Sequence, residues 1–194
     1  MELLRGHVIT ALCDVRSSPY SRFVPQFNRE ALKAEAVLHG IVYLYLGAEL
    51  GPRSADLTCY ENGKVKYRRL AASEIFQQGL GRLRKAMETH RVALMCAEKD
   101  PLTCHRMILI CRHLQGDDIV IRHILEDGSL EDNRDAEKRL MKLWKIGPAD
   151  LFSTEADRIQ RAYDLQAEKI AYTREEGQGK GRQVGGSSKP INRN

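Results

Sequence analysis

Short apolar runs that end in polar, turn-forming residues recur along the first two thirds of the chain. Runs of this length between such boundaries are typical of buried strands. The predicted strands are residues 8–13, 41–46, 92–95 and 119–121. A hairpin is expected within residues 123–130, because Asp127 and Gly128 favour a tight turn.

Helices are predicted between and after these runs. They cover residues 28–39, 73–87, 104–114, 136–144 and 155–172. Asn28, Ser73 and Thr103 are suitable N-caps for the first three helices, and Gly40 is a suitable stop for the first. Residues 47–70 are rich in Gly, Pro and Arg and are expected to be irregular.

Alternation of strands and helices predicts an α/β fold with a mainly parallel, Rossmann-like sheet flanked by helices. We expect residues 1–150 to form the α/β domain, 151–172 a C-terminal helix and 173–194 a disordered basic Gly/Ser-rich tail. In such sheets ligands bind beyond the carboxyl ends of the strands. The loops after Cys13, Leu46 and Met95 would all leave the sheet at that edge.

Composition indicates a soluble, cytoplasmic protein. The chain of 194 residues is 42% hydrophobic and 29% charged, and it has no apolar run near the ~20 residues of a membrane span. Five cysteines, an odd number, predict reduced thiols. The net charge is +5, but five basic and two acidic residues lie from Thr173 onward, so most of the excess belongs to the expected tail. This placement favours a solvated tail over a nucleic-acid interface.

The loop after residue 95 contains the densest group of reactive side chains. Cys104 and His105 would lie in the first turn of a helix, where free amides favour a thiolate and attract anions. Glu98 would serve as an acid or base, or would hold His105 in one tautomer. Arg106 would face the same crevice, with pairing to Asp100 as the structural alternative.

A metal site is not predicted in this loop. Cys96 and Cys104 are eight positions apart and form no Cys-x-x-Cys pair, and Cys96 is as well explained by packing. Leu102 stands where a phosphatase-type cysteine loop would need arginine, and no Gly-rich phosphate loop is present. No cofactor is expected.

The loop after residue 13 has the composition of an anion site. Arg16 and Arg22 flank serines that include Ser21, and guanidinium groups with nearby hydroxyls suit phosphate or carboxylate. Asp14 would act as a base, or would form a structural network with Arg16. Tyr43, from the following strand, would line the pocket or simply pack.

These motifs resemble one known family. Asp14-Val15-Arg16-Ser17-x-Pro19-x-Ser21-Arg22 and Cys96-Ala97-Glu98-x-x-Pro101-x-x-Cys104-His105-Arg106 are similar to those of the bacterial and archaeal "domain of unknown function 488" family. The resemblance implies a compact α/β domain whose two motifs face a common pocket, with no settled activity. Family members usually begin with a strand and a Thr-Ile-Gly-His-Ser-like turn, and this sequence starts after that point. Two alternatives stay open: an N-terminal element is missing from this sequence, or this is a shortened member that lacks a central strand and one wall of the pocket.

The leading hypothesis is an enzyme that acts on a phosphate-bearing substrate, a nucleotide or nucleic acid. Its expected catalytic residues are Asp14, Glu98, Cys104 and His105. Its expected substrate-binding residues are Arg16, Ser21, Arg22, Tyr43 and Arg106. Two alternatives stay open: a non-catalytic module that binds nucleic acid or another partner, and a thiol redox sensor that uses Cys96 and Cys104. The sequence predicts no membrane partner and does not determine the oligomeric state.

Overall fold

Three parallel strands form the centre of the molecule, which we describe from a computed structural model over residues 1–114, 116, 119–148 and 153–174. The strands are β1 (Ala11–Asp14), β2 (Val42–Tyr45) and β5 (Val92–Met95), in the order β2-β1-β5. Asp14 lies opposite Tyr45 and Met95, so all three strands end at one edge. The predicted α/β fold with a parallel, Rossmann-like sheet flanked by helices is confirmed.

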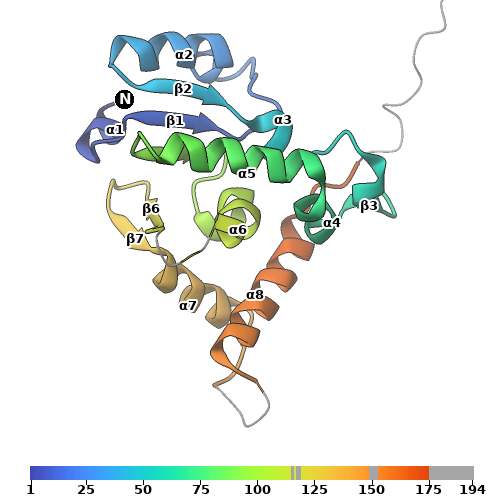
Figure 1. Ribbon diagram of the computed structural model, residues 1–194. Helices are drawn as coiled ribbons and strands as arrows, with labels where there is room; N and C mark the ends of the chain where they lie inside the picture. Colours follow the sequence, from blue (N-terminus) through green and yellow to red (C-terminus); the bar gives the residue numbers. More distant parts are fainter. Residues whose placement is uncertain (115, 117–118, 149–152, 175–194) are drawn as a thin grey trace, which may run out of the picture.

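Helices cover both faces of this sheet (Figure 1). The first, α2 (Arg29–Leu38), buries Leu32 and Ala36 against Leu12 of β1. On the other face, α5 (Glu74–Met87) contributes Leu80 to the larger core cluster, which also contains Cys13. All four residues of β1 are buried because each face of this central strand is covered.

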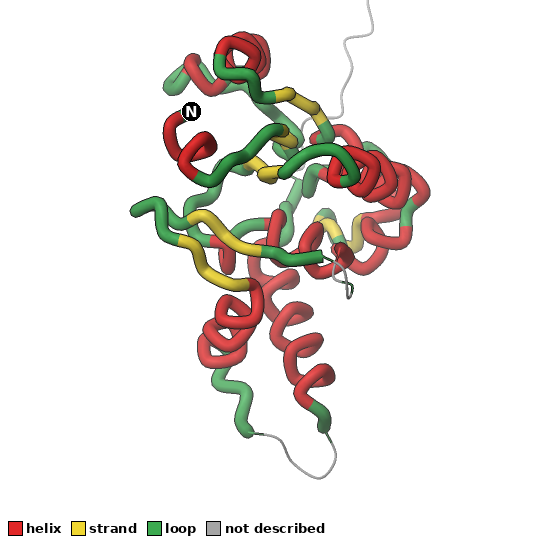
Figure 2. Tube along the Cα trace, turned by 60° about the vertical axis from the view of Figure 1, so that its left-hand side comes forward, coloured by secondary structure: helices red, strands yellow, loops and turns green. Residues whose placement is uncertain are grey.

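The second half of the chain builds a helical layer beneath the sheet. A hairpin of β6 (Arg122–Ile124) and β7 (Leu130–Asp132) leads into α7 (Asn133–Leu143), and α8 (Glu155–Ile170) follows. The last two helices pack against each other and extend away from the sheet as a pair (Figure 2). The structure confirms the two predicted C-terminal helices and the predicted hairpin, in which Gly128 has positive φ. It also confirms the predicted helices before and after β2.

Residues 47–70 are more ordered than the sequence predicted. Leu50, Cys59, Val65 and Leu70 are buried and anchor short elements whose apolar residues are too sparse to show a helical or strand period. The elements are α3 (Gly47–Leu50), a 3-10 turn (Leu57–Cys59), β3 (Tyr60–Glu61), β4 (Lys64–Val65) and α4 (Tyr67–Ala72).

Two sequence predictions are wrong in detail. Residues 119–121 form no strand, because Val120 is 77% exposed and pairing begins only at Arg122. Thr103 does not cap the following helix. It belongs to a 3-10 turn (Pro101–Thr103) capped by Asp100, and a π-helical segment (Arg106–Cys111) and α6 (Arg112–Leu114) come next.

Few elements remain to be placed outside the layers described above. Residues 1–10 contain one short helix, α1 (Glu2–Gly6), and a second 3-10 turn (Pro25–Phe27) precedes α2. The tail expected over 173–194 lies, from residue 175 onward, outside the described residues. Within the described part, no helix combines the length and apolar character needed to cross a membrane.

Candidate functional site

Asp14 is the centre of a hydrogen-bonded network at the carboxyl end of β1. The residue is completely buried. Its carboxylate accepts from Nε and Nη2 of Arg16 at 2.8 and 2.6 Å, and from the hydroxyl of Tyr43 at 2.6 Å. Desolvation would raise the pKa of Asp14, but these hydrogen bonds outweigh it and hold the pKa below its ordinary value. The carboxylate therefore stays ionised and fixes both partners.

The guanidinium of Arg16 is largely occupied by this network. Besides the bidentate pair with Asp14, its Nη2 donates to the carbonyl of Phe27 at 2.9 Å, and its side chain is only 13% exposed. An anion that bound Arg16 through Nε and Nη2 would have to displace the buried Asp14 carboxylate from two hydrogen bonds. The geometry thus favours a positioning role for Arg16 and Asp14, which is the structural alternative left open by the sequence.

Ser21 and Arg22 lie farther along the same loop, toward the start of α2. The amide of Ser21 donates to Oδ1 of Asn28 at 2.6 Å, so Asn28 uses its side chain to hold this loop. The guanidinium of Arg22 lies over the exposed ring of Phe23, 5.0 Å from its centroid. Arg22 is exposed and Ser21 is half-buried, and their assignment to substrate binding stays a prediction.

Four potential ligand atoms converge in the loop after β5. Sγ of Cys96 lies 2.8 Å from Oε2 of Glu98 and 3.1 Å from Nδ1 of His105. Sγ of Cys104 lies 3.2 Å from the same carboxylate oxygen. All four ligand atoms are within 4.8 Å of one another. The fold brings together two cysteines that the sequence separates by eight positions, and this cluster is called the thiol cluster below.

The orientation of His105 links the thiol cluster to the loop after β1. Nε2 of the buried ring lies 3.1 Å from the carbonyl of Val15. Since a carbonyl only accepts, Nε2 carries a proton, and the lone pair of the neutral ring is on Nδ1, facing Cys96. Asp14-Val15-Arg16 and Cys104-His105-Arg106 are therefore in direct contact through one hydrogen bond.

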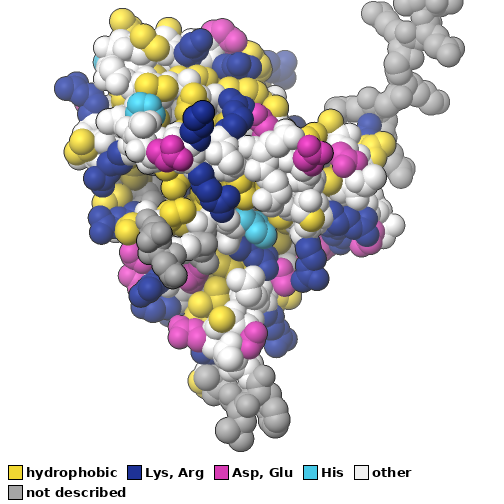
Figure 3. Space-filling model, viewed as in Figure 1, with side chains coloured by type: hydrophobic (Ala, Val, Ile, Leu, Met, Phe, Trp, Pro, Cys, Tyr) yellow, Lys and Arg dark blue, Asp and Glu magenta, His cyan; other side chains and the backbone are white. Residues whose placement is uncertain are grey.

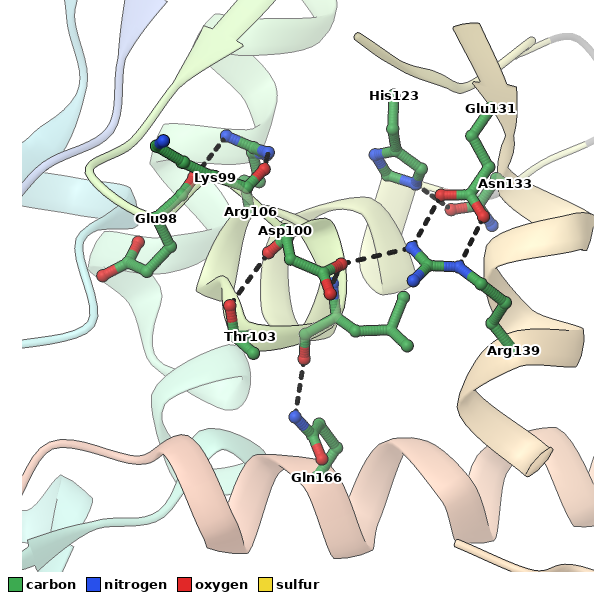
Figure 4. Close-up of polar contacts among 11 residues, drawn as sticks. Glu98, Lys99, Asp100, Thr103, Arg106, His123, Glu131, Asn133, Arg139 and Gln166 are labelled. Atoms are coloured by element: carbon green, nitrogen blue, oxygen red, sulfur yellow. Dashed lines mark hydrogen bonds and ion pairs between the residues drawn. The ribbon is translucent and has the colours of Figure 1, made fainter. Parts of the chain in front are cut away.

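Arg106 within the loop, together with side chains from α7 and α8, holds residues 98–106 in place (Figure 4). Arg106 donates to the carbonyls of Glu98 and Lys99 at 3.1 and 2.8 Å, while the Glu98 carboxylate points away from this guanidinium. Arg139 of α7 pairs with Asp100 at 3.2 Å, and Gln166 of α8 donates to the carbonyl of Leu102 at 2.6 Å. The helical layer thus fixes the backbone that carries the thiol cluster.

The electrostatics of the thiol cluster favour a protonated Cys96 in the absence of a cation. The neighbouring Cys104 thiol, and then burial, raise the pKa of Cys96 above its ordinary value. Desolvation of the Glu98 carboxylate opposes ionisation, but hydrogen bonds from both thiols outweigh it and lower the pKa of Glu98. Within the described residues, Glu98 forms no ion pair with Lys or Arg.

A separate cavity of about 550 Å³ lies along the outer edge of β5. Its apolar wall includes Ile9, Leu83 and Met87. Among the described residues its lining contains no Asp or Glu, and apart from the Cys111 thiol its ionisable side chains are those of His7, His90, Arg91, Arg106, Arg122 and His123. Arg106 is the member shared with the loop that carries the thiol cluster.

The sequence reasoning missed this cavity. Arg91 comes directly before β5 and Arg122 begins β6, so basic residues that border apolar runs were the available signal. The return of residues 119–124 to the edge of β5 is a long-range contact, and local periodicity does not encode it.

Comparison with known proteins gives one match. A family model described as "Domain of unknown function DUF488" matches residues 1–112, which include both loops of the site. No curated protein and no solved structure matches the sequence. The match supports the resemblance carried by the two motifs, and the chain belongs to the DUF488 family, a domain family of unknown function.

Proposed function

We propose that the protein is an enzyme that acts on a phosphate-bearing substrate, a small nucleotide, bound in the cavity along the outer edge of β5. The observation that carries this proposal is the described lining, where basic side chains lie beside apolar walls and none of the described residues is acidic. A volume of about 550 Å³ is within the ordinary range of small-molecule sites. The apolar wall suits a base or sugar, and the basic groups suit phosphate.

Arg91 and Arg122 are the main phosphate ligands in this proposal. Both are exposed, and neither forms an ion pair with another described residue. A guanidinium without an acidic partner offers its full set of donors to phosphate in a bidentate fork. In contrast, two guanidinium donors of Arg16 are already hydrogen-bonded to the Asp14 carboxylate.

The reacting groups are proposed to come from the loop that borders the cavity at Arg106. Glu98 is its exposed acid–base candidate, and Cys104 and His105 are buried. These three side chains lie outside the cavity lining, so in this proposal the substrate extends past Arg106 to reach them. Asp14 acts indirectly, by holding Arg16 and Tyr43 while Val15 orients His105. Parallel sheets commonly carry their reactive residues at this carboxyl edge.

The test is a binding and turnover panel of nucleoside mono- and triphosphates and a short oligonucleotide. Wild type is compared with Arg91→Ala and Arg122→Ala, and Arg161→Ala on α8 is the matched control because it is exposed and outside the cavity lining. Losing one charged hydrogen-bonding partner costs about 1.5 kcal/mol or more, so each cavity variant should bind at least about tenfold more weakly. Equal affinities for all four proteins would refute the cavity as the site.

The same panel separates a pocket from a nucleic-acid surface. Lys and Arg side chains are spread over the face in Figure 3, mixed with acidic ones, and do not form one continuous basic patch there. A small nucleotide carries few phosphates for the protein to neutralise, so its affinity should weaken only moderately as the salt concentration rises. Binding of the oligonucleotide alone, with a steep salt dependence, would favour the surface instead.

A further inference from the structure

We propose that Cys96, Glu98, Cys104 and His105 form a zinc site that binds one Zn²⁺ per chain. The inference does not need the proposed nucleotide substrate, because it rests on the thiol cluster alone, but a bound zinc would hold Glu98, Cys104 and His105 as ligands in place of the reacting roles proposed for them above. Two sulfur atoms, one imidazole nitrogen and one carboxylate oxygen are donors that Zn²⁺ takes in four-coordinate sites. Thiolate and imidazole donors disfavour Mg²⁺ and Ca²⁺, which prefer oxygen ligands.

The distances within the thiol cluster suit a tetrahedral ion. Zinc bonds of 2.0–2.3 Å place neighbouring ligand atoms about 3.3–3.8 Å apart. The contacts from Cys96 to Glu98, from Cys96 to His105 and from Cys104 to Glu98 are 2.8, 3.1 and 3.2 Å. All ligand atoms lie within 4.8 Å of one another, so movements of less than about an ångström admit the ion.

The hydrogen-bond inventory of the thiol cluster points to a cation. When His105 is neutral, its ring proton is on Nε2 at the carbonyl of Val15, which leaves the lone pair of Nδ1 directed at Cys96. The two S–H groups then supply two protons for three short contacts, so one contact joins two lone pairs. A cation at the centre satisfies all four ligands, with two thiol protons released to solvent.

The surroundings of the ligands are those of a supported metal site. The hydrogen bond from His105 to a carbonyl is the partner that ligating histidines commonly have, and it fixes Nδ1 toward the thiol cluster. The amide of Arg106 donates to Sγ of Cys104 at 3.4 Å, an outer contact of the kind that orients a ligand. Cys104 and His105 are buried, Cys96 is half-buried and Glu98 is exposed, so the site has one open side for entry.

Metal content and spectroscopy of the full chain test the proposal. We expect one zinc per purified chain, removable by chelator and restored by titration. Replacement by Co²⁺ should give a thiolate-to-cobalt charge-transfer band and the intense visible bands of a four-coordinate ion. Cys96→Ala should weaken zinc binding by about 100-fold or more, because even outer-shell partners contribute 10–100-fold. Cys59→Ala is the matched control, since that buried cysteine lies outside the thiol cluster.

A measurement on wild type keeps the test independent of variant folding. Zinc should protect Cys96 and Cys104 from alkylation, read by mass spectrometry, while leaving the labelling of Cys59 unchanged. Equal zinc binding by Cys96→Ala and wild type would overturn the proposal, as would alkylation that zinc does not alter. A Cys96–Cys104 disulfide that forms in air equally with and without zinc would also overturn it, in favour of a redox switch.

Discussion

Replacing Asp14 by alanine removes the acceptor on which the first loop of the site converges. The carboxylate is fully buried and accepts from the amide, Nε and Nη2 of Arg16 and from the hydroxyl of Tyr43. Removing one partner of a buried ion pair costs about 3–5 kcal/mol, because the remaining charge loses its compensation. In the variant the Arg16 guanidinium keeps its hydrogen bond to the Phe27 carbonyl, and its side chain is 13% exposed to water. We therefore expect a loss of unfolding free energy at the low end of this range, about 3 kcal/mol.

Urea and thermal unfolding measure this loss. A change of about 3 kcal/mol in a domain of this size corresponds to about 6–12 °C in Tm. The matched control is Asp135→Ala on α7, whose pair with Lys138 at 2.8 Å is exposed and should contribute about 0–1 kcal/mol. If Asp14→Ala were as stable as Asp135→Ala, the network would not be structural, and an active role for Asp14 would regain favour.

The pH dependence of this effect has a definite sign. The pKa of Asp14 lies below its ordinary value in the folded protein, so the unfolded chain binds the proton more tightly. The stabilisation is therefore complete above about pH 5 and is lost as the pH falls through the ordinary value near 4 toward the folded pKa. Asp14→Asn should lose less stability than wild type between about pH 5 and pH 2. Parallel acid curves for the two proteins would contradict this assignment.

Three further predictions concern the framework of the site. Gly47→Ala should destabilise the protein by about 2 kcal/mol or more in urea unfolding, because an added Cβ would lie 1.9 Å from the carbonyl oxygen of Arg16. Tyr163→Phe should cost about 1–3 kcal/mol, since the buried hydroxyl donates to Glu137 at 2.9 Å, and an unchanged unfolding midpoint would contradict it. Burial lowers the pKa of His123, so unfolding free energy should fall as the pH drops through about 6.5; His123→Gln should reduce that slope.

The sequence predicted the strands and their common edge because the signal is local. Each strand of the central sheet is a short apolar run, and a buried parallel strand needs no alternation. The prediction failed where burial depends on distant segments. Residues 119–121 are apolar but form no strand, and Val120 is 77% exposed.

The composition of the site was easier to predict than its geometry. Asp14 and Arg16 were expected in one loop and Tyr43 in the lining of the same pocket, but only the folded structure shows Tyr43 bonded to the same carboxylate as Arg16. The eight-residue spacing of Cys96 and Cys104 argued against a metal site, because the familiar metal-binding motifs place paired cysteines within a single turn of the chain. Here the 3-10 turn Pro101–Thr103 reverses the chain and returns Cys104 to Cys96.

Arg106 joins the two proposals physically. Arg106 lines the basic cavity, and its guanidinium donates to the carbonyls of Glu98 and Lys99 in the loop that carries the thiol cluster. The two carbonyls take two of the five guanidinium N–H donors, which leaves three for an anion in the proposed cavity site. If both proposed sites bind their ligands, any effect of one ligand on the affinity for the other must be reciprocal and equal in factor, so titrating nucleotide with and without zinc measures whether Arg106 couples the two sites.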